Sequence, residues 1–169
     1  MSRISYKKIF LWLLLFIFTC HKDDPPPPDT SLAVNLTASS SEIGTGEPLT
    51  VFIEVKNADL LFALSFELIY SSDLFDTDIT AITAGNLFAN PFLVSESNFL
   101  SDGEFPVALG NLGTIQGSAS GTVCSIILTS NSIGSDLLYI SSLHMIKEDG
   151  SFIDGFDMLS VEPLEVVVY

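Results

Sequence analysis

L-F-A-L-S-F-E-L-I-Y, residues Leu61 to Tyr70, is the segment of this chain with the clearest structural periodicity. Its even-numbered positions are all apolar, whereas its odd-numbered positions are mixed. Because strand side chains alternate between two faces, the pattern predicts a β-strand with one core face and one face that meets water or a partner. A helix would scatter the aromatic residues around its axis. On this interpretation the core face carries Phe62, Leu64, Phe66, Leu68 and Tyr70.

The rest of the chain from Ser31 to Tyr169 has the same β character. Short apolar segments alternate with turn signals rich in Gly, Asn and Asp, which is typical of a sandwich or barrel. No segment shows an amphipathic helix over three turns, and no internal repeat is visible, so we predict one all-β domain. The predicted strands are Ala33–Ala38, Leu49–Asn57, Leu61–Tyr70, Ile79–Thr83, Phe92–Glu96, Glu104–Leu109, Gly121–Ser130, Leu137–Leu143 and Leu164–Val168.

Composition and charge narrow the function classes. Among the 169 residues, 47% are hydrophobic and 13 are Phe, which is ample for a core and argues against disorder. From Cys20 onward only three lysines face all 21 acidic residues. A domain this acidic repels phosphate backbones, so we expect no nucleic-acid partner. A simpler interpretation of the same negative charge is that it only keeps a secreted protein soluble.

The N-terminus has the features of a targeting segment. Arg3, Lys7 and Lys8 precede an apolar run from Ile9 to Phe18 that is short for a membrane span. Cys20 closes this run and resembles the lipobox cysteine of bacterial lipoproteins, although Phe18 and Thr19 depart from the usual small residues. We therefore predict a signal peptide over residues 1–19 and lipidation of Cys20. An uncleaved signal anchor with an incidental cysteine is the alternative.

The residues after Cys20 support this prediction. His21-Lys22-Asp23-Asp24 resembles the short signal that sends some Gram-negative lipoproteins to the outer face of the outer membrane. Pro25 to Pro28 then predict a stiff polyproline II spacer. We expect residues 20–30 to be a linker, residues 31–169 to be the folded domain, and the protein to be an outer-membrane lipoprotein facing either the periplasm or the exterior.

The inventory of reactive side chains is sparse. His21 and His144 have no Cys or His at metal-ligand spacing, and Cys124 is the only thiol left once Cys20 is lipidated. The segment 149–157 has recurrent oxygen ligands but lacks the pattern of a calcium-binding loop, which favours a turn. Nothing places two carboxylates across a cleft, and no phosphate-binding loop or nucleophile motif is present. We expect no cofactor, no metal and no catalytic residue, and hence no enzyme.

A series of motifs between Ser31 and Tyr169 is similar to bacterial cohesin domains. In that family a strand of the pattern G-x-x-hydrophobic-x-V leads to a second strand ending in Tyr-Asp-Pro, with a leucine beyond. This chain has Ser71-Ser72 in place of Asp-Pro. The motifs that carry the resemblance are Glu47-Pro48-Leu49-Thr50-Val51 through Asn57, Leu61 to Tyr70, Leu74-Phe75, Ala84-Gly85-Asn86-Leu87-Phe88-Ala89-Asn90, Gly117 to Val123, Leu138-Tyr139-Ile140-Ser141 and Asp149-Gly150.

The resemblance implies a flattened, nine-stranded β-sandwich of jelly-roll topology that binds dockerin modules on one sheet face. It maps that face to the strands at Leu61–Tyr70, Phe92–Glu96, Glu104–Leu109 and Leu137–Leu143. Small outward side chains would make a flat platform, and a lone Tyr could anchor a helix laid across it. Family members often carry Asn and Asp where this chain has Ala63 and Ser65. The predicted outward residues are Ala63, Ser65, Glu67, Glu104, Pro106, Ala108, Tyr139 and Ser141.

Two other interpretations of this face stay open. The first is an ordinary solvated sheet face. The second is a glycan-binding surface, because carbohydrate-binding modules share the sandwich architecture. Sugar binding usually requires an aromatic platform, and the only Trp, Trp12, lies in the signal segment. Of the tyrosines only Tyr139 is predicted to project from a sheet face. The sequence therefore favours a dockerin-like protein partner over a glycan, and places an enzyme last.

Overall fold

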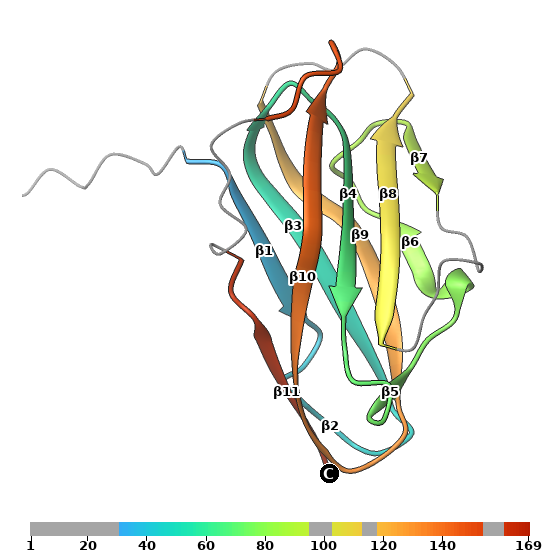
Figure 1. Cartoon of the computed structure of the whole chain (residues 1–169). Coiled ribbons are helices and arrows are strands. Elements are labelled where there is room, and N and C mark those ends of the chain that lie inside the picture. The colour runs from blue at the N-terminus through green and yellow to red at the C-terminus, as the bar shows by residue number, and fades with distance from the viewer. Residues whose placement is uncertain (1–30, 95–102, 113–117, 154–160) are drawn as a thin grey trace, which may run out of the picture.

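A computed structural model of the chain describes residues 31–94, 103–112, 118–153 and 161–169. Over these residues the chain forms two β-sheets that pack face to face (Figure 1). The first sheet contains β1 (Ala33–Ala38), β3 (Pro48–Asp59), β9 (Ser118–Ser130), β5 (Phe75–Asp76) and β6 (Ile82–Ala84). The second contains β2 (Glu42–Ile43), β11 (Leu164–Val168), β10 (Gly134–Lys147), β4 (Leu61–Ile69), β8 (Glu104–Asn111) and β7 (Pro91–Val94), each named in its order across the sheet.

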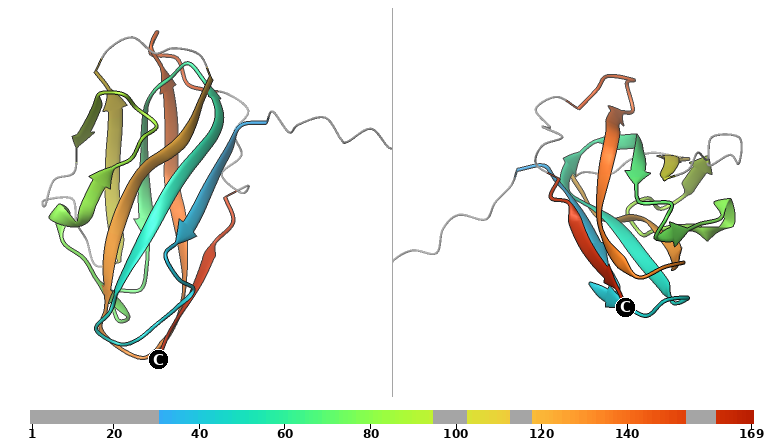
Figure 2. Two further views of the ribbon diagram at one scale, coloured as in Figure 1. Left: turned by 180° about the vertical axis from the view of Figure 1, so that it is seen from behind. Right: turned by 60° about the horizontal axis from the view of Figure 1, so that its bottom comes forward.

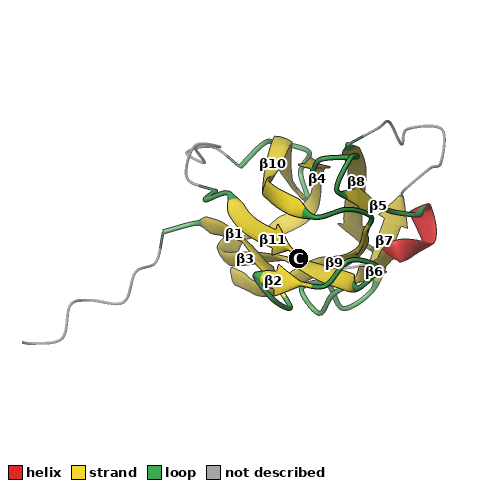
Figure 3. Cartoon of the chain, turned by 90° about the horizontal axis from the view of Figure 1, so that it is seen from below, coloured by secondary structure: helices red, strands yellow, loops and turns green. Residues whose placement is uncertain are grey.

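Antiparallel pairing dominates both sheets. In the first, β1, β3 and β9 are neighbours, and β9 pairs on its other edge with β5 and β6. In the second, only the pairing of β2 with β11 is parallel. Figure 2 shows the long strands β3 and β9 from behind, and Figure 3 shows the two layers from below. The predicted all-β sandwich is confirmed.

The core lies between the sheets and is built from alternate residues of each strand. In β4, Leu64, Phe66 and Leu68 are buried, as the alternation predicts. Phe105 and Leu109 of the neighbouring β8 join them, and the first sheet contributes aliphatic side chains from β3 and β9. Every described residue of the buried hydrophobic cluster lies between positions 34 and 168.

The start of the predicted core face of β4 needs correction, whereas its end does not, because Tyr70 is half-buried and packs against the core. Phe62 is only half-buried, whereas Leu61 is fully buried. The cause is a register shift: Ile146 of β10 pairs with Ala63, and the next residue, Lys147, pairs with Leu61. Phe62 is thus an extra residue in β4, and this bulge reverses the side-chain alternation at the start of the strand.

All nine predicted strands have counterparts, although several differ in extent; β10, for example, continues to Lys147 where the prediction ended at Leu143. The two-residue strands β2 and β5 were not predicted. The segment predicted as the strand Ile79–Thr83 begins as a 3₁₀ turn, η1 (Ile79–Ala81), capped by the side chain of Asp78, and only then becomes β6. The predicted strand Phe92–Glu96 ends outside the described residues.

The targeting segment, Cys20 and the linker also lie outside the described residues. Within the described part of the chain, no helix has the length and apolar character that crossing a membrane would require.

Candidate docking face

The outer face of β7, β8, β4 and β10 gathers the predicted partner-binding residues. In β4, the side chains of Ala63, Ser65 and Glu67 are half-buried and alternate with core residues. The pairing of β4 with β8 sets Ala108 beside Ser65 and Pro106 beside Glu67. Because directly paired residues of neighbouring strands point to the same side of a sheet, these side chains form one continuous surface.

β10 contributes Tyr139 and Ser141 to this surface. Tyr139 pairs with Ile69 and is 44% exposed, and Ser141 pairs with Glu67. The Ser141 hydroxyl donates a hydrogen bond to Glu67 Oε2 over 2.8 Å. This contact positions the Glu67 carboxylate on the outer face while leaving it partly open to solvent.

A bulge in β10 adds His144, which lies one residue beyond the predicted strand Leu137–Leu143. Ser141 pairs with Glu67 and His144 with Ser65, so β10 has one more residue than β4 over this interval. Ser142 has a φ of 52°, in the left-handed region. After the bulge the even-numbered residues face outward, which exposes His144 and leaves Leu143 buried.

The upper half of the face is an apolar groove. Its floor consists of the small residues Ala63, Ser65, Ala108 and Gly110 on β4 and β8. Larger side chains rise on both sides, Phe92 and Val94 from the edge strand β7 and Ile146 from β10. The hollow has a volume of about 320 Å³. We call this surface the docking groove, and its residues are Phe62, Ala63, Ser65, Phe92, Val94, Ala108, Gly110, Asn111, Leu112 and Ile146.

Two exposed aromatic residues border this region and were missed by the sequence analysis as site residues. Phe92 is 53% exposed, and it pairs with Gly110, which has no side chain to cover it. Phe152 is 58% exposed and forms an isolated bridge with Ile146. Its ring centroid lies 6.1 Å from that of His144, at an interplanar angle of 58°. The only signal in the sequence for either residue is that Phe92 directly follows the turn residues Asn90-Pro91. The structure shows that this strand, β7, lies at the edge of its sheet.

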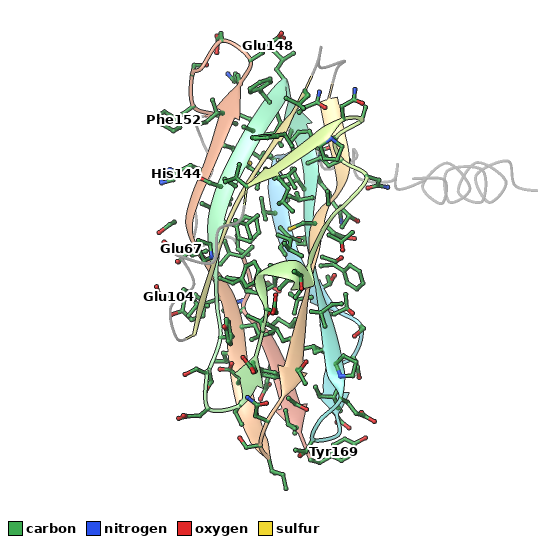
Figure 4. The ribbon with its side chains drawn as sticks, turned by 90° about the vertical axis from the view of Figure 1, so that its right-hand side faces the viewer. Glu67, Glu104, His144, Glu148, Phe152 and Tyr169 are labelled. Carbon is green, nitrogen blue, oxygen red and sulfur yellow. The ribbon has the colours of Figure 1, made fainter. Side chains whose placement is uncertain are left out.

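The lower half of the face carries negative charge. In Figure 4 the labelled side chains of Phe152, His144, Glu67 and Glu104 project from the same side of the sandwich, in that order from top to bottom. Glu104 is exposed and pairs with Ile69, which lies two residues beyond Glu67 on the same face of β4. We call the surface around Glu67 and Glu104 the acidic end. It adjoins the docking groove along the strands.

The described side chains offer little for catalysis or metal binding. Burial raises the pKa of the Cys124 thiol to about 12, which suppresses the reactive thiolate. Asp149 accepts hydrogen bonds from the Ser151 hydroxyl and amide, which lower its carboxyl pKa and account for it as a turn former. Nowhere in the described residues do three His, Cys, Asp or Glu side chains come together to hold a metal ion. Asp154 and Asp157 of the segment considered for calcium lie outside those residues.

No protein-family model and no curated protein matches this sequence. Solved structures do match. A non-cellulosomal cohesin from the archaeon Archaeoglobus fulgidus superposes with a TM-score of 0.64 at 14% identity, over 82% of this chain and 91% of that one. A type II cohesin domain from the cellulosome of Acetivibrio cellulolyticus gives 0.67 at 13% identity, over 80% and 95% of the two chains.

A third similar structure was solved with a partner. It is the sixth cohesin of scaffoldin B from Acetivibrio cellulolyticus, in complex with a mutant dockerin. Its TM-score is 0.62 at 14% identity, and the match covers 82% of this chain and 99% of that one. At such low identity the likeness establishes the fold and nothing finer. The described domain therefore has the jelly-roll sandwich fold of cohesin modules.

Proposed function

We propose that this domain is a non-catalytic protein-binding module that docks a dockerin-like partner on the outer face of β7, β8, β4 and β10. The observation that carries the proposal is the docking groove, an apolar hollow with a floor of small side chains. Exposed apolar surface of this kind marks interaction sites. The cohesin fold, and a similar structure described as a complex with a dockerin, support the same partner class.

A second candidate, a carbohydrate-binding module, is favoured by the exposed rings of Phe92 and Phe152. The lining of the groove argues against it. Its polar side chains are Ser65 and Asn111, and the Asn111 Oδ1 already accepts a hydrogen bond from the Asn90 amide. A sugar buried there would have few polar groups to bond, and each of its hydroxyls left without a hydrogen bond costs about 1–3 kcal/mol. Apolar side chains of a protein partner carry no such cost.

We also propose that Cys20 carries a lipid anchor that displays the module at the outer membrane, where its partners would take part in polysaccharide degradation. The charged N-terminal residues, the apolar run and the proline spacer support the anchor. The resemblance to cohesins supports the link to polysaccharides. Metabolic labelling with a palmitate analogue tests the anchor: Cys20→Ser should lose the label, and equal labelling of the variant would refute the proposal.

The docking proposal is tested by Ser65→Arg. Ser65 lies on the floor of the groove, so an Arg side chain there would occupy the space into which the partner packs, either buried without a counter-charge or lying across the floor toward Glu67. Burial of an unpaired charge costs about 3–5 kcal/mol, which corresponds to roughly a 150-fold to 5,000-fold loss of affinity. Calorimetry against a dockerin module that the parent protein binds, and against a glycan panel, measures the effect.

Two variants serve as controls for this experiment. Ser65→Ala keeps the floor flat and should bind as the parent does. Thr129→Arg places the same charge on an exposed position of β9, in the opposite sheet, and should also bind normally. Full affinity in a folded Ser65→Arg variant, or a clear glycan isotherm in the parent, would overturn the assignment of this face.

A further inference from the structure

We infer that two copies of this chain associate through the docking groove, each inserting Phe92 of its edge strand β7 into the groove of the other. The inference goes beyond the proposed function, because it gives the groove an occupant from the chain itself and makes self-association a competitor of any docked partner. Three observations carry it: the relief of the groove, the edge position of β7, and the distribution of charge.

The relief of the groove repeats in two rows of paired residues. Each row is large at both ends and small in the middle, so the groove lies between a ridge on β7 and a ridge on β10. Its floor is two strands wide, which is about 10 Å, and so admits one ridge of side chains from another sheet. Across β7, β8, β4 and β10 the rows read Phe92, Gly110, Ala63, Ile146 and Val94, Ala108, Ser65, His144.

The ridge on β7 is the one that a second copy can reach. β7 is an edge strand, and among the described residues its only strand partner is β8. Phe92 is 53% exposed and Val94 is 38% exposed. The ridge on β10 is flanked instead by the hairpin that bridges Ile146 to Phe152. An apolar ridge at a sheet edge, directly beside an apolar groove, gives one face both halves of a self-complementary contact.

Two-fold symmetry then fixes how the copies face each other. An axis across the strands keeps the order of the strands, so it would lay β7 on β7 and leave both grooves empty. An axis parallel to the strands, between β7 and β8, reverses that order and lays β7 of each copy over β8 and β4 of the other. Residues keep their level along the strands, so Phe92 faces Gly110 of the other copy, the floor position without a side chain.

Charge restricts where two copies can meet. From Cys20 onward three lysines face 21 acidic residues, so two domains repel each other over most of their surface. The overlapping parts of β7, β8 and β4 carry no charged side chain in the two rows, and Glu67 lies beyond them. An overlap of three strands belongs to the weak, transient class of interfaces, below about 1,200 Å² in total. Association should therefore be weak and should strengthen with salt, which screens the repulsion.

Sedimentation velocity of the full chain in detergent micelles measures the association. We expect a dimer whose Kd rises at least tenfold on Phe92→Ala, because the inserted ring is lost. Gly110→Val should have the same effect by filling the floor, and the fold should tolerate it, since a Cβ at Gly110 would make only ordinary contacts with Ala63 and the Phe62 carbonyl. The matched control is Ile127→Ala, which removes an exposed apolar side chain from the opposite sheet and should leave Kd unchanged.

A cross-linking experiment locates the contact. The full chain carries a photo-reactive phenylalanine analogue at position 92, and equal amounts of ¹⁵N-labelled and unlabelled copies are mixed in phosphatidylcholine liposomes. We expect cross-links from position 92 of one isotope to the peptide containing Gly110 of the other. Cross-links confined to single copies would overturn the inference, as would a parent that stays monomeric at about 1 mM or a dimer that salt weakens.

The outcomes separate this inference from the proposed function. A monomeric parent that binds a dockerin module and loses it on Ser65→Arg would overturn the inference and leave the docking function intact. A dimer lost on Phe92→Ala, together with a dockerin module retained on Ser65→Arg, would do the reverse. Equal Kd values for the parent, Phe92→Ala and Gly110→Val would show that any dimer forms elsewhere and would also overturn the inference.

Discussion

Replacing Phe66 by Ala tests the strand register on which the docking face depends. Phe66 is 2% exposed in the middle of β4, where it pairs with Val107 of β8, which is also buried. Its neighbour Glu67 points to the opposite face. The two adjacent residues therefore offer a matched comparison: one side chain is enclosed in the core, and the other borders solvent.

The two substitutions should differ several-fold in free energy of unfolding. Removing a buried Phe side chain loses about 2–3 kcal/mol of transfer free energy. The cavity left between the sheets adds to this, for a total of about 3–5 kcal/mol. Glu67→Ala loses the hydrogen bond from the Ser141 hydroxyl. That bond is partly exposed and should contribute about 1 kcal/mol or less.

Urea denaturation followed by circular dichroism measures both values. With a slope of about 2 kcal/mol per molar urea, Phe66→Ala should lower the transition midpoint by about 2 M, and Glu67→Ala by about 0.5 M or less. An unchanged slope would show that both variants unfold between comparable states. Similar losses at the two positions would refute the alternation of β4, and with it the placement of Ser65 and Glu67 on the docking face.

Three further predictions concern other parts of the domain. Gly85→Ala should destabilise the fold by about 1–3 kcal/mol in urea melts, because its Cβ would clash with the Thr122 carbonyl oxygen. Gly44→Ala, whose nearest neighbour is the movable Glu47 side chain, should be tolerated, and equal losses for the two variants would contradict this packing. Cys124 should resist a thiol reagent at pH 8 in the folded protein and react on unfolding, because burial raises its pKa to about 12. If mass spectrometry found rapid labelling of Cys124 in the folded protein, its place in the core would be contradicted. Asp149 has a lowered carboxyl pKa in the folded state, so its contribution to stability is present above the unfolded pKa and is lost as pH falls through the folded pKa. Asp149→Asn should therefore be less stable than the parent at pH 7 but not at pH 2. An equal difference in stability at both pH values would exclude the carboxylate as the cause.

Much of the architecture could be predicted from local patterns. Alternation over Leu64, Phe66 and Leu68 identified the core face of β4, because the two-residue period of a strand is a local property. The turn signals separated all nine predicted strands. The same reasoning could not find β2 and β5, since two residues are too few to show a period and both strands exist only through pairing with distant segments.

The docking face was predictable in part. The sequence alone determined that Ala63, Ser65 and Glu67 share one face and that the described part of the chain is all-β. That its acidity excludes a nucleic-acid partner stays a prediction. The tertiary structure alone placed His144 on that face and Leu61 in the core, through the bulges at Ser142 and Phe62. A bulge reverses the alternation of every residue beyond it, and its position is set by which distant strand supplies the hydrogen bonds. The docking groove arises in the same way, because its width and walls depend on the order of four strands across a sheet and not on any local pattern.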